Sequence, residues 1–234
     1  MKICFVAWSD FGIGGVPRVL TCLMDALSRK HDVSLYSLKN LPPSGIQGIN
    51  REQIHIYCRE MNLYEKIRRS AADILVCKTP LFSSALGCRL YAAARYTSGF
   101  KKALTNHLNK HQYDVVIFGS GFEDSLLLAL TKNKLLPSMR ILTWSHASYD
   151  NYFTNMGSFF SRYMKEAIKA YYHRFDEIIV LSDGDEKEFR EKHHLPARRI
   201  YNPNTMNPAR KSTLTSKTFV YVGALSHQKG TDLA

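Results

Sequence analysis

Residues 1–30, MKICFVAWSDFGIGGVPRVLTCLMDALSRK, carry the pattern that decides the fold. Residues 2–8 form an almost unbroken apolar run, which is typical of a parallel strand buried on both faces. Residues 9–15 contain three glycines within four positions, and apolar residues at helical spacing follow from 16 to 27. Pro17 suits a first helical turn, where an N–H group has no intrahelical partner. A glycine-rich turn between a strand and a helix N-terminus predicts a place where backbone N–H groups can approach an anionic ligand.

The rest of the chain repeats this alternation of strands and helices. Residues 31–38 predict a second strand, which completes a strand-helix-strand unit and implies a parallel sheet. Further strands are predicted at 53–58, 113–118, 140–144 and 177–181, and helices at 123–134, 158–174 and 183–193. We therefore expect an α/β protein with a Rossmann-like parallel sheet and helices on both faces.

A polar segment divides the chain unequally. Residues 205–217 are rich in Thr, Ser, Asn, Pro and Lys with little apolar material, which predicts a linker. Residues 1–204 form the first predicted domain. Residues 218–223 begin a new strand, so residues 218–234 are expected to start a second domain that is truncated.

Charge and hydropathy narrow the class of partner. The 234 residues carry 32 basic and 20 acidic side chains, for a net charge of +12, and 45% of them are hydrophobic. Neither a long apolar span nor a signal-peptide core is present, so a cytoplasmic location is expected. The charge favours an anionic partner, but the sequence contains no nucleic-acid-binding module, so we expect none of that class.

Two segments could meet an anionic membrane. Residues 59–111 are mostly helical in pattern and carry ten basic against three acidic residues. The helix predicted at 158–174 interleaves aromatic and basic side chains, which suits a membrane interface and equally suits a stripe facing the core. Peripheral attachment to the inner face of the membrane is therefore one expectation.

The five cysteines are odd in number and widely spaced, without a CxxC pair. That pattern predicts reduced, buried thiols rather than disulfides or a metal site.

The opening loop does not match a dinucleotide fingerprint. Residues 12–14 supply the first half of G-x-G-x-x-G, but Pro17 stands where the third glycine belongs, and Lys39 follows the second strand in place of an acid. A nicotinamide or flavin site is thus disfavoured. The glycines could instead serve only to pack the helix on the strand. His146 follows an apolar strand, where side chains of open α/β sheets reach the ligand crevice.

The most specific segment lies near the end of the sequence. Residues 219–233, FVYVGALSHQKGTDL, resemble the strand, loop and helix that open the donor-nucleotide domain of the family 4 glycosyltransferases, enzymes of the GT-B fold. The loop at 14–15, the histidine after a middle strand, residues 180–182 and residues 200–203 agree with this resemblance. It covers the chain in order, although only the last fifteen residues match sharply.

The resemblance implies two Rossmann-like domains that face each other across a cleft, with the acceptor on the first and a nucleotide sugar on the second. It implies hexosyl transfer with retained anomeric configuration, no metal ion, and no cofactor apart from the donor substrate. By position, His146 would be the catalytic residue that contacts the donor sugar. The donor diphosphate would be bound by Gly14, Gly15, Gly223, Lys229 and Gly230, and the acceptor cleft would contain Gly119, Ser120, Gly121 and Glu123.

The expected function is synthesis of a cell-surface polysaccharide or glycolipid, with a nucleotide-sugar donor and a lipid-linked or saccharide acceptor. Two departures qualify it. Ala224 stands where the family usually has Arg, and the sequence ends before the paired glutamates of the family's donor domain, so we expect a fragment that is inactive alone. The alternatives are a non-catalytic domain that binds an acceptor or a partner, and a GT-B sugar-nucleotide epimerase, for which Glu123 and Asp124 are the nearest acids.

Overall fold

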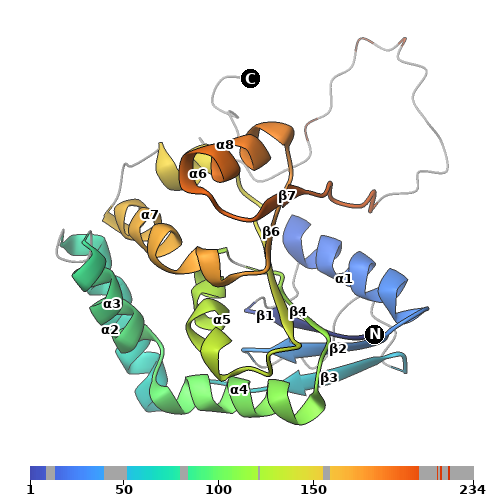
Figure 1. The fold of residues 1–234 in the computed structure, drawn as a ribbon, viewed down its shortest axis with the longest axis horizontal. Helices are drawn as coiled ribbons and strands as arrows, with labels where there is room; N and C mark the ends of the chain where they lie inside the picture. The colour runs from blue at the N-terminus through green and yellow to red at the C-terminus, as the bar shows by residue number, and fades with distance from the viewer. Residues whose placement is uncertain are drawn as a thin grey trace.

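The computed structural model describes residues 1–8, 14–39, 52–79, 84–120, 122–154 and 159–205, and the single residues 215, 217 and 221. Within these ranges the chain forms a seven-stranded sheet in the order β3-β2-β1-β4-β5-β6-β7, in which every pairing is parallel (Figure 1). The strands are β1 (Lys2–Ala7), β2 (Asp32–Ser37), β3 (Ile54–Cys58), β4 (Val115–Phe118), β5 (Arg140–Trp144), β6 (Glu177–Val180) and β7 (Ala197–Arg199).

The central strand β1 shows why its sequence is apolar without alternation. Ile3, Phe5 and Ala7 belong to one hydrophobic core, and Cys4 and Val6 belong to a second core on the other face of the sheet. Both faces of a strand in a parallel sheet are covered by helices, so each position must be apolar. The predicted Rossmann-like α/β class is confirmed.

Helices cover both faces of the sheet. They are α1 (Gly15–Ser28), α2 (Leu63–Lys78), α3 (Ala85–Arg95), α4 (Ser98–His111), α5 (Leu126–Thr131), α6 (Tyr149–Phe153), α7 (Phe159–Tyr171) and α8 (Asp183–His193). Helix α1 packs Leu20 and Met24 into the core that contains Phe5. The α3, α4, α5 and α7 helices contribute to the core on the opposite face (Figure 1).

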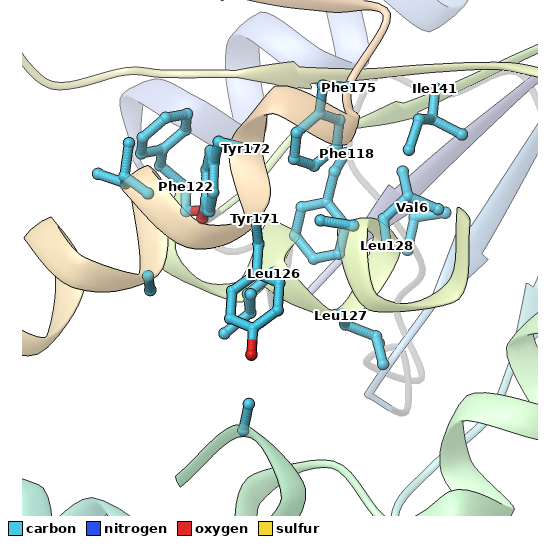
Figure 2. Close-up of a cluster of buried hydrophobic side chains, with 14 of the residues drawn as sticks. Val6, Phe118, Phe122, Leu126, Leu127, Leu128, Ile141, Tyr171, Tyr172 and Phe175 are labelled. Atoms are coloured by element: carbon cyan, nitrogen blue, oxygen red, sulfur yellow. The ribbon is translucent and has the colours of Figure 1, made fainter. Parts of the chain in front are cut away.

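The aromatic residues 163, 171, 172 and 175, in and just after the helix predicted at 158–174, belong to the interior. Tyr163, Met164 and Ile168 of α7 are buried, and Tyr172 and Phe175 pack beside Phe118 and the leucines of α5 (Figure 2). The Tyr172 hydroxyl donates a hydrogen bond to the Phe122 carbonyl at 2.5 Å, so its polar group is satisfied inside the core. For the rings that the structure describes the core-facing interpretation therefore holds, and the side chains of residues 159 and 160 lie outside the described part of the chain.

Two details differ from the expectation. The basic segment 59–111 is mostly helical, as predicted, and contains α2, α3 and α4, but α6 and β7 were not expected. Both are short: α6 follows the strand predicted at 140–144, and β7 follows the helix predicted at 183–193. All five cysteines are free as expected, but Cys58 and Cys77 are exposed because they lie at the end of edge strand β3 and on the outer side of α2.

None of the described helices is long and apolar enough to cross a lipid bilayer. The predicted linker and second domain fall almost wholly outside the described residues, so the division at 204 stays a prediction.

Candidate functional site

The sheet reverses its strand order between β1 and β4. The chain winds outward through β2 and β3 on one side of β1, and through β5, β6 and β7 on the other side of β4. Ligands of open α/β sheets bind outside the carboxyl ends of the strands at such a switch point. Val6 and Phe118 are register partners, so the segments that follow β1 and β4 leave the sheet side by side. The predicted glycines at 14–15 and 119 lie on these two segments.

Gly14 and Gly15 lie at the N-terminus of α1, beyond the carboxyl end of β1. Gly14 has an extended backbone, with φ of 171°, that any residue can adopt. No side chain caps the helix and no acidic residue occupies its first turn, so its positive dipole end is not compensated locally. A Cβ atom at Gly15 would have no atom of the described chain within 4 Å. The absence of a side chain therefore leaves this helix end open to a ligand.

Gly119 allows α1 to pack against the end of β4. A Cβ atom there would lie 2.4 Å from Cδ2 of Leu20, which is fully buried. Ser120 has a comparable structural role, because its Oγ accepts a hydrogen bond of 2.6 Å from the Trp8 backbone N–H and so ties the ends of β1 and β4 together. Gly121 lies outside the described residues. Glu123 belongs to the 3-10 helix Phe122–Ser125, and the structure describes only its backbone.

His146 lies two residues beyond β5 and is held against the same strand end. Its Nε2 atom is 3.1 Å from the carbonyl oxygen of Gly119, and since a carbonyl only accepts, Nε2 carries the proton. The ring stacks on Trp144 at 5.8 Å between centroids. Burial lowers the pKa of His146, although the bond to Gly119 opposes this effect. The residue is therefore neutral at pH 7 with a lone pair on Nδ1.

That lone pair has no hydrogen-bond partner within the described residues, although Nδ1 is buried. Buried polar atoms are satisfied in most native structures, so an unpaired acceptor at a ligand crevice is a candidate contact. The structure thus brings together two predicted site residues, His146 and Gly119. It also leaves Nδ1 as the nitrogen that could accept a hydrogen bond from a ligand hydroxyl.

A buried ion network beneath the site was not predicted from the sequence. Arg95 donates to Asp124 at 2.6 Å and Arg69 donates to it at 3.0 Å, which links α2 and α3 to the segment after β4. Burial alone would raise the pKa of Asp124, but the two guanidinium groups outweigh it and hold the pKa below its usual value. Asp124 is consequently a structural carboxylate rather than a base for proton abstraction.

A cavity of about 370 Å³ lies beside the switch point. Trp8, Leu38 and Glu60 place it over the ends of β1, β2 and β3, since they follow these strands in sequence. Its remaining lining residues are Lys39, Met61, Lys66, Arg69 and Ser70. The Arg69 guanidinium stacks 3.8 Å from the centre of the Trp8 ring, so the cavity combines cations with an aromatic wall. The sequence held one signal for this cavity, namely the basic residues Lys66 and Arg69 in the segment that follows the strand predicted at 53–58.

The remaining predicted donor contacts, Gly223, Lys229 and Gly230, lie outside the described residues. In the parts of the chain that are described, no three His, Cys, Asp or Glu side chains are grouped to hold a metal ion.

One sequence family and two solved structures are similar to this chain. The sequence pattern of Glycosyltransferase Family 4 matches residues 13–203. Among solved structures, HepE of Anabaena in complex with UDP-glucose is 12% identical with a TM-score of 0.48, over 86% of this chain and 44% of that one. Apo UGT2 of Phytolacca americana is 9% identical with a TM-score of 0.46, over 88% of this chain and 52% of that one.

No curated protein sequence matches the chain. The chain spans about half the length of the two solved structures. Because the family pattern covers most of the 234 residues, from the loop before α1 to the segment after β7, this chain belongs to Glycosyltransferase Family 4.

Proposed function

We propose that this chain is the acceptor side of a retaining glycosyltransferase that uses a nucleotide sugar to build a cell-surface polysaccharide or glycolipid. In this reaction the bond between the sugar C1 and the diphosphate oxygen breaks, and a bond from C1 to an acceptor hydroxyl oxygen forms. The diphosphate leaves with its bonding electrons, and the acceptor proton passes to the departing phosphate oxygen. The metal-free character implied by the family resemblance is part of the proposal.

The observation that carries the proposal is the position of His146. Its ring is fixed by the Gly119 carbonyl, and its unpaired Nδ1 lies at the strand edge where the α1 N-terminus begins. A neutral imidazole nitrogen can accept a hydrogen bond from a sugar hydroxyl and so orient C1 for attack. The dipole of α1, with Gly14 and Gly15 open to approach, favours the negative diphosphate on the same edge.

The second half of the diphosphate site would come from Gly223, Lys229 and Gly230. A fixed cation such as Lys229, aimed where charge develops on the leaving group, stabilises the transition state more than the ground state. The acceptor would occupy the neighbouring cavity, where Lys66, paired with Glu60, and Arg69, paired with Asp124, form a polar wall beside the Trp8 ring.

The test is His146→Ala in the full-length product of the gene, with transfer of labelled sugar from a nucleotide donor as the readout. We expect the rate to fall by roughly 100-fold or more, in the range found for loss of one oriented hydrogen-bonding group in an active site. His55→Ala is the matched control, since His55 is an exposed residue of edge strand β3. It should leave the rate unchanged.

Equal rates for the wild type and His146→Ala would contradict the role of His146. No transfer by the wild type with any nucleotide sugar would instead favour the non-catalytic alternative. The epimerase alternative has less support, because Asp124, one of its two nearest acids, is paired with Arg95 and Arg69.

A further inference from the structure

We propose that the outer side of the α2–α3 helix pair is a docking surface for an anionic lipid bilayer. We call this surface the α2–α3 face. It consists of large apolar side chains from both helices, namely Leu63, Tyr64, Ile67, Ile74, Leu75, Leu86 and Leu90. Figure 1 shows the two helices side by side at one margin of the molecule, away from α1 and β7.

The apolar side chains of this face are unusually exposed. Each leaves between 51% and 73% of its surface accessible, and most of the exposed large apolar residues in the described part of the chain lie here. Leu63, Ile67 and Ile74 follow a helical spacing on α2, and Leu86 and Leu90 do so on α3. An apolar stripe on the solvent side of a helix is normally covered by another surface.

The two stripes form one continuous face. Arg68 of α2 donates to the carbonyl oxygen of Ala93 at the end of α3, and to the Tyr64 hydroxyl, both at 3.2 Å. The N-terminal half of α2 thus lies beside the C-terminal half of α3.

Cations flank the apolar residues, whereas the acids of the same helices turn inward. Lys78 and Arg89 are exposed beside the face, Arg68 is half-buried within it, and Lys66 is exposed but paired with Glu60. The two acids of these helices, Glu65 and Asp73, are both paired with arginines. Glu65 is buried and binds Arg59 at 2.9 Å, and the Asp73 carboxylate pairs with Arg95. A face with apolar side chains and positive charge is complementary to the boundary of an anionic bilayer.

The face is held rigidly on the molecule. Asn62 and Glu65 form a capping box at the start of α2, and Glu65 also accepts a hydrogen bond from Thr97, the N-cap of α4. Behind the face, Tyr91 of α3 packs edge-on against Tyr163 of α7 at 4.2 Å between centroids. Because the helices are already ordered, docking would not incur an additional cost of folding them.

A bilayer fits these features better than a protein partner does. Protein interfaces are depleted in lysine at their centres, whereas here the exposed cations Lys78 and Arg89 lie on the same two helices as the exposed apolar residues. The position of the cavity adds a second reason. Lys66 and Ser70 line it from the same helix that presents Ile67 and Ile74 outward. This inference deepens the proposed function, because docking would bring the head group of a lipid-linked acceptor to the cavity.

The test is sedimentation of the 234-residue chain with vesicles, with no donor or acceptor present, so its outcome is independent of catalysis. The vesicles contain either phosphatidylcholine alone or phosphatidylcholine with about 30% phosphatidylglycerol, whose negative charge attracts basic segments. We expect binding to the anionic vesicles at low salt and a marked loss as the Debye length falls from about 10 Å at 0.1 M to about 3 Å at 1 M salt.

Two variants locate the surface. Ile67→Ser combined with Ile74→Ser, Leu86→Ser and Leu90→Ser should weaken binding at least ~10-fold, since binding scales with the apolar area inserted. Its control is Ile200→Ser with Tyr201→Ser, which removes exposed apolar residues elsewhere. Lys78→Gln with Arg89→Gln should weaken binding about 25-fold, at roughly fivefold per cation, and its control is Lys102→Gln with Lys187→Gln.

Circular dichroism tests whether each variant is folded. If the serine variant does not fold, the vesicle binding of the charge variant alone tests the docking surface. Absence of binding to anionic vesicles at low salt would overturn the proposal. So would equal losses in the α2–α3 variants and their controls. A wild-type dimer that the serine variant converts to a monomer, without vesicle binding by either, would assign the face to a second copy of the chain instead.

Discussion

At the scale of single residues, two glycines that look alike in sequence have different roles. Gly119 lies against the buried side chain of Leu20, whereas Gly15 has open space where a Cβ would be. A sequence alone allows either role for any glycine, a turn or a close approach, and the surrounding atoms decide between them. One glycine serves packing, and the other leaves room for a ligand.

Gly119→Ala should reduce the free energy of unfolding by about 1–3 kcal/mol, because the new methyl group overlaps Leu20 in a packed core. Gly15→Ala is the matched change and should be neutral or stabilising by up to ~1 kcal/mol, since it restricts the unfolded chain without a clash. Urea unfolding of both variants measures the difference. Equal stability of the two variants would show that the contact between β4 and α1 tolerates the added atom.

The same Gly15→Ala variant separates folding from ligand approach. If a diphosphate approaches this helix end closely, the methyl group should weaken nucleotide-sugar binding while stability is preserved. Calorimetric titration of the full-length protein with the donor measures this effect.

At the scale of elements, the Arg95–Asp124 pair fixes α3 to the segment after β4. Asp124 also receives Arg69 from α2, so one buried carboxylate joins three elements below the α2–α3 face. A buried ion pair is weak evidence for stability in itself, but the removal of one partner leaves the other uncompensated. The orientation of the helix pair should therefore depend on both partners.

Arg95→Met should lower the free energy of unfolding by about 3–5 kcal/mol, because Asp124 would lose its nearest cation in a buried site. Arg198→Met removes an exposed partner of Glu177, with a distance of 2.7 Å, and should cost at most about 1 kcal/mol. Thermal unfolding of both variants gives the comparison. A small effect at Arg95 would indicate that Arg69 alone compensates Asp124.

At the scale of the whole molecule, several groups make stability depend on pH in the same direction. His107 of α4 packs between Tyr36, Tyr57 and His111, with 4.5 Å between ring centroids in each pair. Burial, followed by the charges of His111 and Lys110, lowers the pKa of His107 to about 4. The unfolded chain, with an ordinary histidine pKa of 6.5, therefore takes up the proton first.

The stability that neutral His107 contributes is complete above about pH 6.5 and is lost as the pH falls towards 4. Asp124 acts at lower pH, because its folded pKa lies below 3.8, and its contribution disappears as the pH falls further. Unfolding in urea at a series of pH values should give a free energy that declines from pH 7 to pH 4. His107→Gln should flatten this decline, whereas His55→Gln should retain it, and an unchanged slope in His107→Gln would contradict the assignment.

The sequence alone determined the sheet, because a parallel strand covered on both faces must be apolar at every position. The continuous runs at 2–8 and 113–118 therefore predicted β1 and β4, whereas the strand order, and with it the switch point, came from the structure. The position of His146 beyond a strand also followed from local sequence. These features depend on neighbouring residues and on a period that a sequence displays directly.

Only the tertiary structure decided which amphipathic surfaces are covered. The aromatic helix α7 and the basic helix α2 both fit a membrane interface in sequence, yet α7 faces the core and α2 leaves its apolar side exposed. The same holds for Asp124, whose partners Arg69 and Arg95 lie 55 and 29 positions away. Burial and ion pairing between distant residues arise from packing. The hydrophobic period of a helix shows which of its sides is apolar, but it does not show which element, if any, packs against that side.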